Sequence, residues 1–473
     1  MEQRYDHQHG QDLNRALGPF GLTALGIGAI IGAGIFVITG AAAAKFAGPG
    51  IVFSFMIAGV GCLFAALCYA ELAAMIPQSG SAYTYAYATM GQFFAWMIGW
   101  DLILEYLGAA SAVAVGWSGY FSAFMKDIGW EIPAQFANAP LAAKGFELSW
   151  TGAILNVPAV ALIVLLTTLL IVGIRASAGV NNIMVFVKVG IIVMIILFGL
   201  PLINPDNLTP FVPENTGEWG EFGWSGVLRA SGVIFFAYIG FDAVSVAARE
   251  AKNPQRDMPV GILGSLFICT ALYILMSLTL VGLTDYTTLN VPNPASFAIQ
   301  QAGPSLSWLV PLVNIAAIVG LATVVLVSLY GQTRIFFAMA DDGFLPQAFA
   351  KVHPTFRTPY RGTLLTGFFA ALLAGLFPLD LLGELVSIGT LLAFVVVCVA
   401  VLVLRQTHPK ANRPFRTPWV PFVPLAGIGV CGLMMVSLPP DTWIRLAVWF
   451  FLGLIVYALY SSKHAKKPQF QIN

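Results

Sequence analysis

The apolar residues of this chain lie in long runs that short polar segments separate, and they do not alternate with polar residues. A membrane-spanning helix needs about 20 consecutive apolar residues. The pattern therefore predicts an all-α integral membrane protein. Its twelve candidate transmembrane helices lie approximately at residues 20–44, 50–76, 93–124, 153–172, 182–203, 226–248, 260–283, 308–338, 363–377, 384–404, 421–438 and 443–461.

Two of these apolar runs are interrupted. The first contains Gly26–Phe36, with four glycines in eleven residues, and each glycine costs a helix about 1 kcal/mol relative to alanine. The sixth contains Phe235–Asp242, where aromatic residues and a glycine break the pattern. Within a bilayer, non-helical backbone occurs only where it is buried in protein or lines a cavity, because no water is present to satisfy its polar groups. We therefore expect helices 1 and 6 to be broken beside a site at mid-depth.

The amides freed at the first break indicate what this site binds. The N–H groups of Gly32, Ala33 and Gly34 would begin a second half-helix, whose N-terminal end favours an anion such as a substrate carboxylate. Small residues also allow helices to pack closely. Four glycines in so short a stretch favour the break over close packing alone.

The two interrupted helices divide the chain into repeats. Helices one to five occupy residues 20–203 and helices six to ten occupy 226–404, and each unit begins with an interrupted helix. Because five is an odd number, the second unit enters the membrane from the opposite side. This is the inverted-repeat plan of secondary transporters, which bind substrate between paired broken helices. An N-terminal segment (1–19), a connector with helices 11 and 12 (405–461) and a tail (462–473) complete the predicted organisation.

The basic residues predict the orientation. If the N-terminus is cytoplasmic, seventeen lysines and arginines lie inside and five outside, and Lys188 lies within a span. Cytoplasmic loops carry the excess of basic residues. We therefore expect a multi-pass protein of the cytoplasmic membrane with both its N- and C-termini in the cytoplasm.

The composition excludes several function classes. With 58% hydrophobic and 10% charged residues, the chain is not an ordinary soluble protein. A net charge of +1 without a basic, aromatic-interleaved patch gives no indication of nucleic-acid binding. The five cysteines fall in apolar runs and the histidines in polar segments, so we expect no metal, cofactor or catalytic set. A channel would need a continuous series of polar residues, which the sequence lacks.

Five motifs carry a family resemblance. They are Gly26–Phe36; Tyr69–Ala73 with Pro77–Tyr83; Phe236–Asp242 followed by Glu250–Pro259; Gly331–Arg334 through Met339–Pro346; and Arg413–Pro418. The resemblance extends over nearly the whole chain. The sequence resembles a bacterial member of the cationic amino acid transporter family, within the amino acid/polyamine/organocation superfamily. The resemblance implies the LeuT-type five-plus-five inverted-repeat fold and amino acid transport.

The resemblance also assigns roles to residues at the two breaks. Backbone amides that would bind the substrate α-carboxylate belong to Ile31, Gly32, Ala33 and Gly34. Backbone carbonyls that would accept from its α-ammonium belong to Ile30, Phe236, Ala237 and Ile239. Phe236 also resembles the aromatic gate over the substrate. Many relatives carry Ser or Thr where this chain has Ala33, so one hydroxyl contact is lost and the amides remain.

Lys188 is an isolated charge within the fifth predicted helix. A charge at the bilayer centre costs at least about 2.5–3.5 kcal/mol on insertion scales. Burial disfavours the charged form of a lysine, which allows it to exchange a proton. Lys188 resembles the lysine that replaces the sodium ion of LeuT-type symporters in proton-coupled members, and the isolated Thr323 on helix eight is consistent with this. The alternative is a structural lysine bonded to the carbonyls of the broken helix.

Four acids also fall within or beside the predicted helices: Glu71, Asp101, Glu105 and Asp242. Glu105 shares a helix face with Asp101 and either meets the side chain of a cationic substrate or holds helices together. Asp101 is expected to be structural, and Glu71 to be a gate or packing residue. Asp242 either caps the half-helix that follows the second break or senses charge in the pocket.

Pairs of opposite charge near the cytoplasmic side are candidates for an inner latch: Arg249 with Glu250, and Arg334 with Asp341 or Asp342.

These observations predict a proton-coupled symporter that moves an L-amino acid by alternating access. Its expected partners are the substrate, protons and membrane lipids. The nearest rival is an exchanger for amino acids or polyamines with the same fold. The sequence leaves open whether the substrate is cationic or neutral, which oligomer forms, and whether a small membrane subunit accompanies the transporter.

Overall fold

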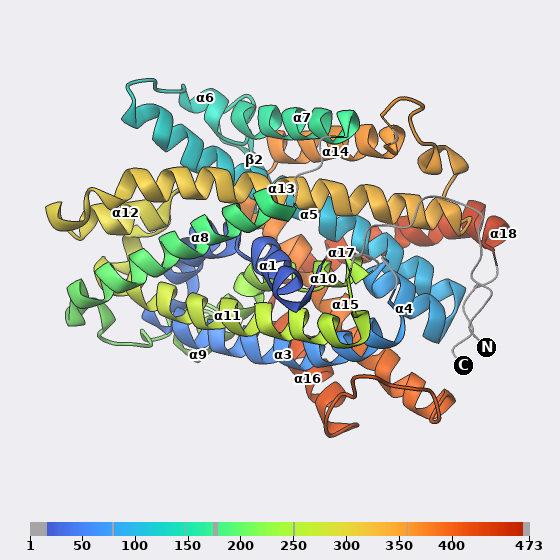
Figure 1. The fold of residues 1–473 in the computed structure, drawn as a ribbon. Coiled ribbons are helices and arrows are strands. Elements are labelled where there is room, and N and C mark those ends of the chain that lie inside the picture. Colours follow the sequence, from blue (N-terminus) through green and yellow to red (C-terminus); the bar gives the residue numbers. More distant parts are fainter. Residues whose placement is uncertain are drawn as a thin grey trace.

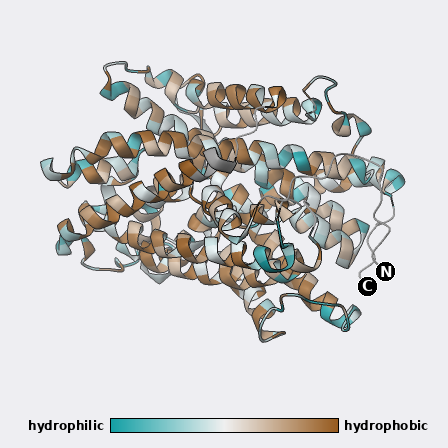
Figure 2. Ribbon diagram, viewed as in Figure 1, coloured by the Kyte–Doolittle hydropathy of each residue, from teal (hydrophilic) through white to brown (hydrophobic). Residues whose placement is uncertain are grey.

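The computed structural model describes residues 17–77, 80–145, 147–173, 178–248, 251–356 and 358–466. The described chain is helical apart from one antiparallel hairpin of β1 (Leu141–Lys144) and β2 (Glu147–Trp150) (Figure 1). Hydrophobic residues cover the middle of the helices, and hydrophilic residues gather at their ends and in the connections (Figure 2). This distribution fits a bilayer around the helix bundle.

The elements follow one another in three groups. The first is α1 (Pro19–Ile30), a π-helical segment (Gly34–Ile38), α2 (Thr39–Ala42), a second π-helical segment (Ala43–Ala47), α3 (Ile51–Met75), α4 (Ser81–Met90), α5 (Gln92–Asp127), α6 (Ala134–Ala137), α7 (Val157–Val172) and α8 (Ala178–Gly199). The second is α9 (Gly223–Ile234), a 3₁₀ turn (Phe235–Tyr238), α10 (Ala243–Val246), α11 (Pro254–Leu283), α12 (Pro294–Gln301), α13 (Leu309–Asp341), α14 (Tyr360–Leu376) and α15 (Leu379–Thr407). The last is α16 (Phe422–Ser437), α17 (Pro440–Val456), a π-helical segment (Tyr457–Ser461) and α18 (Ser462–His464).

Each range predicted from the apolar runs contains a helix. Within the described residues, eight helical stretches are long and apolar enough to cross a membrane, and α1, α7, α14 and α16 are shorter apolar helices. Several helices extend beyond their apolar run. For example, α11 begins at Pro254 and its first turn contains Asp257, whose carboxylate accepts from the Asn253 amide at 3.0 Å. The number of membrane crossings stays a prediction.

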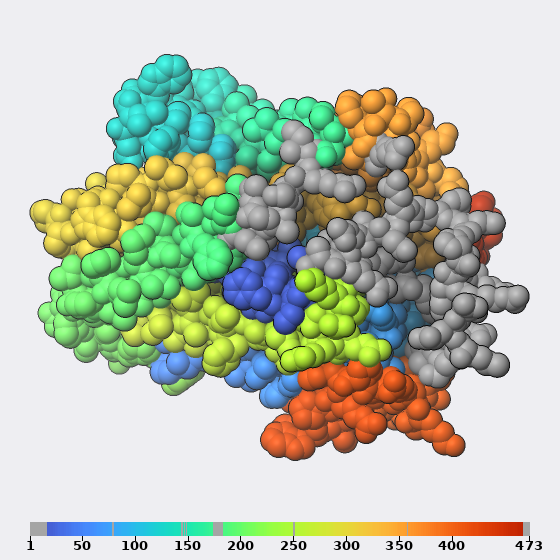
Figure 3. All heavy atoms as spheres, viewed as in Figure 1, coloured from blue at the N-terminus to red at the C-terminus, as the bar shows by residue number. Residues whose placement is uncertain are grey.

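Long helices surround the short helices α1 and α10. α13 packs along α5, and α11 packs along α3. α1 and α10 lie in the middle of the bundle (Figure 1), and α1 contacts α8 and α11, between which its surface is visible in Figure 3. These two short helices are therefore held by longer ones.

A buried carboxylate fixes the segment between α15 and α16. Glu71 on α3 is completely buried, and its two oxygens accept from Arg405 Nε at 3.1 Å and Nη2 at 2.8 Å. Arg413 Nε donates to the same carboxylate at 3.1 Å, and so does the Thr417 amide at 2.7 Å. The predicted packing role of Glu71 fits these contacts, which join α3, α15 and the connector.

Arg413 also closes the end of α15. Its Nη2 donates to the carbonyls of Leu404 at 3.2 Å and His408 at 2.8 Å. The last carbonyls of a helix lack partners within the helix, so a buried guanidinium that also neutralises Glu71 stabilises this end. The proline-rich connector is thus attached to the core.

We predict that Glu71→Ala lowers the free energy of unfolding by about 3–5 kcal/mol, because it leaves the buried Arg413, whose side chain is 3% exposed, and the partly exposed Arg405 without their counter-charge. Unfolding titrated with SDS in mixed micelles measures this. The control is Lys126→Ala, which breaks the Lys126–Glu131 pair; that pair is 3.3 Å long and its side chains are 69% and 73% exposed, so the loss is about 0–1 kcal/mol. Equal losses in the two variants would contradict this role of Glu71.

Candidate functional site

The first helix break lies between α1 and the π-helical segment. α1 ends at Ile30, and Ile31 has extended backbone with ψ 100°. The N–H groups of Gly32, Ala33 and Gly34 begin the following helical stretch, and the first N–H groups of a helix have no acceptor within it. The Ile31 amide differs, because it donates to the Ile27 carbonyl at 2.9 Å and completes α1. Three of the four amides predicted for a carboxylate therefore face the break, and that of Ile31 is already used.

The second break separates α9 and its 3₁₀ turn from α10. Ile239 is extended with ψ 131°, and Gly240 has a φ of 125°. A Cβ at Gly240 would lie 2.7 Å from the Ala29 carbonyl carbon, and a Cβ at Gly34 would lie 2.2 Å from Ala237 Cα. The two breaks are thus in direct backbone contact, and this contact requires glycine on both sides.

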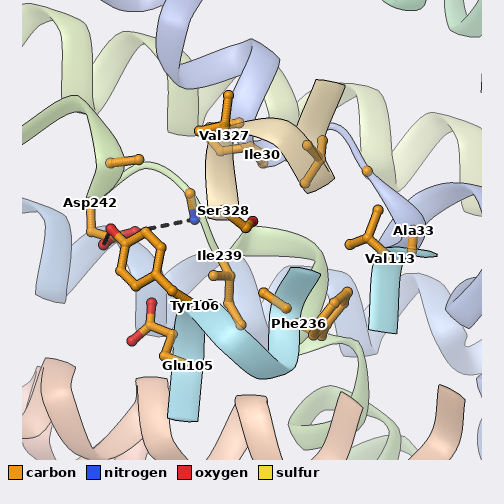
Figure 4. Close-up of a pocket in the computed structure, with 17 residues that line it drawn as sticks. Ile30, Ala33, Glu105, Tyr106, Val113, Phe236, Ile239, Asp242, Val327 and Ser328 are labelled. Carbon is orange, nitrogen blue, oxygen red and sulfur yellow. Dashed lines mark hydrogen bonds between the residues drawn. The ribbon is translucent and has the colours of Figure 1, made fainter. Parts of the chain in front are cut away.

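A small cavity of about 40 Å³ lies against both breaks. Figure 4 shows side chains from the two breaks, α5 and α13 around it. The predicted site residues that line it are Ile30, Gly32, Ala33, Gly34, Glu105, Phe236, Ile239 and Asp242. Ile31 and Ala237 are fully or almost fully buried behind the lining.

The sequence analysis missed residues from α5 and α13 that complete the wall, among them Tyr106, Val113, Val324 and Ser328. Val324 and Ser328 are four residues apart and share one helix face. Tyr106 directly follows Glu105 in the chain. The sequence signal that could have found these residues was their position close to already identified candidates on the same helices.

Asp242 is held by hydrogen bonds from outside its own helix. Its carboxylate accepts from the Tyr106 hydroxyl at 3.2 Å, the Gly240 amide at 3.2 Å and the Ser81 hydroxyl at 3.5 Å. It does not cap the amides of α10. The expectation of a helix cap is therefore wrong: this carboxylate accepts from the Gly240 amide within the break. Glu105 lies beside Tyr106 and is 2% exposed (Figure 4).

Lys188 lies behind the first break and does not line the cavity. Its Nζ donates to the carbonyls of Gly28 at 3.0 Å and Ile31 at 3.2 Å, and the side chain is 1% exposed. Gly320 on α13 makes room for it, since a Cβ there would lie 3.0 Å from Lys188 Cε. The lysine therefore satisfies one carbonyl in the last turn of α1 and one at the break itself.

Two tyrosine hydroxyls also donate to backbone near the first break. Tyr273 donates to the Ile30 carbonyl at 2.8 Å and Tyr120 donates to the Phe36 carbonyl at 2.7 Å. The Ile30 carbonyl, predicted to accept from a substrate ammonium, is thus already an acceptor, and its second lone pair stays available.

Other predicted charges have different environments. Asp101 is completely buried, and neither carboxylate oxygen has a hydrogen-bond partner in the described part of the chain. The Arg334 guanidinium lies 4.9 Å from the Tyr330 ring centroid, and no described ion pair joins it to Asp341 or Asp342. The Arg334 latch is therefore not formed, because this side chain stacks on its own helix. Arg249 and Glu250 lie outside the described residues.

Contacts on each side of the bundle connect distant segments. On the predicted outer side, Lys45 Nζ lies 2.5 Å from Asp380 Oδ2. On the predicted inner side, Tyr83 donates to the Asp342 carboxylate at 2.6 Å and the Lys466 amide donates to the Asp342 carbonyl at 2.9 Å. Burial raises the pKa of the Asp342 carboxyl above its ordinary value.

No group of three metal-ligating side chains gathers among the residues that the structure describes.

Comparisons with known proteins show which family the chain belongs to. A family model for amino acid permeases matches residues 17–462. The chain is 47% identical to the methylthioribose transporter of Bacillus subtilis over 455 residues, covering 96% of this chain and 95% of that protein. It is 47% identical to the branched-chain amino acid permease BcaP of the same organism over 460 residues, 97% and 96% of the two chains.

A more distant relative is the vacuolar cationic amino acid transporter 4 of Arabidopsis thaliana, 39% identical over 397 residues, which are 84% of this chain and 64% of that one. The family-model match, over residues 17–462, spans both helix breaks and the helices around them. The chain therefore belongs to the amino acid permease family of the amino acid/polyamine/organocation superfamily, and it is a membrane transporter and not an enzyme.

Proposed function

We propose that this protein is a proton-coupled symporter of an L-amino acid in the cytoplasmic membrane. It works by alternating access in a five-plus-five inverted arrangement of twelve membrane helices. One observation carries the proposal: two broken helices touch at Gly34 and Ala237 and border a small buried cavity. Broken helices paired in this way supply amides to an anionic substrate group and carbonyls to a cation.

The substrate is recognised through its backbone groups. The amides of Gly32, Ala33 and Gly34 bind the carboxylate, at the positive end of a helical segment. The carbonyls of the second break, at Phe236, Ala237 and Ile239, accept from the α-ammonium together with Ile30. Phe236, which lines the cavity, covers the bound amino acid.

Lys188 couples this site to the proton. When it is charged, it holds the Gly28 carbonyl in the last turn of α1 and the Ile31 carbonyl at the break through charge-assisted hydrogen bonds. Loss of the proton weakens these bonds by removing the charge, so the first broken helix moves more easily. The distances of 3.0 and 3.2 Å support this role.

The cavity limits the size of the transported side chain. A volume of about 40 Å³ favours a short one. Glu105 and Asp242 are the groups that a cationic side chain would meet. The relatives' names include both branched-chain and cationic amino acids, so the substrate test includes both classes.

We expect proteoliposomes in sodium-free buffer to accumulate labelled alanine only when an inward proton gradient is present. Arginine is measured in parallel, and methylthioribose is tested as a competitor. Accumulation of arginine alone would make Glu105 the side-chain ligand. Uptake that requires preloaded amino acid and ignores the gradient would replace symport with exchange.

We predict that Lys188→Ala lowers gradient-driven accumulation at least tenfold, about 1.4 kcal/mol or more, while exchange between preloaded and external amino acid continues. Uptake with and without preloading separates the two activities. Lys126→Ala, which changes an exposed lysine, is the control. Loss of both activities would indicate a purely structural lysine, and normal uphill uptake would exclude Lys188 from coupling.

We predict that Gly34→Ala lowers uptake about tenfold or more, because the added Cβ would lie 2.2 Å from Ala237 Cα and push the breaks apart. The control is Gly190→Ala on α8, where nothing lies within 4 Å of the added Cβ. Initial uptake rates are compared at equal amounts of protein in the membrane. Equal rates in the two variants would contradict close contact of the breaks.

A further inference from the structure

A second cavity lies on the opposite side of α5 from the candidate site. It occupies about 370 Å³ between α5, α14, α15 and α17. Its walls are mostly leucines and aromatic residues, including Leu107, Leu373, Phe377, Leu382 and Trp449. We call it the α14–α17 groove.

Water is an unsuitable occupant for this groove. A volume of about 370 Å³ has room for several waters. A water needs two to four polar partners, and large apolar cavities take up apolar molecules. The walls offer little hydrogen bonding, so the groove fits a hydrocarbon chain.

One charged residue, Arg445, is among the lining residues of the groove. Its Nη2 lies 2.7 Å from the Asp441 carboxylate and donates to the Gly145 carbonyl at 2.6 Å. Both described contacts use Nη2, so Nε and Nη1 retain three of the five N–H donors of a guanidinium. This planar arrangement matches two oxygens of a phosphate.

The position of Arg445 fits a headgroup. It lies in the second turn of α17, which begins at Pro440 on the predicted outer side. Gly108 and Trp449 are nearer the middle of their helices, so the groove runs from the outer ends of α15 and α17 toward mid-depth. An acyl chain whose phosphate is held at Arg445 would follow this direction.

We propose that the α14–α17 groove is a specific phospholipid site, which holds one acyl chain against its leucines and the lipid phosphate at Arg445. The same turn of α5 carries Leu104 and Leu107 in this groove and Glu105 and Tyr106 at the candidate site. The bound chain therefore supports the helix wall of that site from behind. The lipid site itself does not depend on which substrate is transported.

The test is photo-crosslinking of the full chain in membranes with a phospholipid that carries a diazirine on its acyl chain, followed by mapping of the labelled peptides. We expect label on α14 and on residues 104–108. Leu373→Trp fills the groove and lowers this label at least fivefold. The matched control is Leu372→Trp, since Leu372 is 44% exposed on the same helix and does not line the groove.

The phosphate contact is tested by phospholipid retained after detergent washing, measured by mass spectrometry. Arg445→Gln lowers retention about tenfold, as expected for one charge-assisted contact, and Lys126→Gln on the same predicted side leaves it unchanged. Equal label in the two tryptophan variants overturns the groove site. Equal retention in Arg445→Gln and the unaltered chain, or displacement of the phospholipid by free fatty acid, overturns the phosphate contact.

Discussion

The structure depends on the need to satisfy backbone polar groups where helices break inside the membrane. Each unsatisfied N–H or C=O in the hydrocarbon region costs several kcal/mol. At the first break Lys188 donates to the carbonyls of Gly28 and Ile31, and Tyr273 donates to that of Ile30. At the second, the carboxylate of Asp242 accepts from the Gly240 amide. The amides of Gly32, Ala33 and Gly34 are then the backbone groups at the breaks that remain without such a partner. They lie at the candidate site.

The surrounding helices place polar side chains within hydrogen-bonding distance of the two breaks. Gly320 on α13 leaves space for the Lys188 stem, and Tyr106 on α5 reaches Asp242. Farther away, the Glu71 cluster joins α3, α15 and the connector. Rigid long helices thus hold two short, irregular segments in contact.

The sequence predicted the helices and the two breaks well, because both depend on local composition. Long apolar runs identify segments that can lie in lipid, and clustered glycines identify a weak helix. Lys188 stood out because a lone charge in such a run is costly. A purely structural lysine would make hydrogen bonds to the carbonyls of the broken helix, as Lys188 does. The proposed proton-coupling role depends on the same hydrogen bonds.

Contacts between distant segments were beyond this kind of reasoning. The partners of Asp242 come from Ser81 and Tyr106, and only the packing of helices brings them together. The Ile31 amide was assigned to substrate although it completes α1, because the sequence does not fix the last residue of a helix. Helix α4 was missed because Ser81–Met90 is short and rich in tyrosine, so it gives no membrane-length apolar signal.

The most direct test of the account is competition for binding of the transported amino acid to the purified protein, using derivatives blocked at one end. The account predicts that the amide, which lacks the carboxylate charge, and the N-acetyl form, which lacks the ammonium, each bind at least about a hundredfold more weakly than the free amino acid. Binding of either derivative as tight as that of the free amino acid would contradict recognition of the substrate by the two helix breaks.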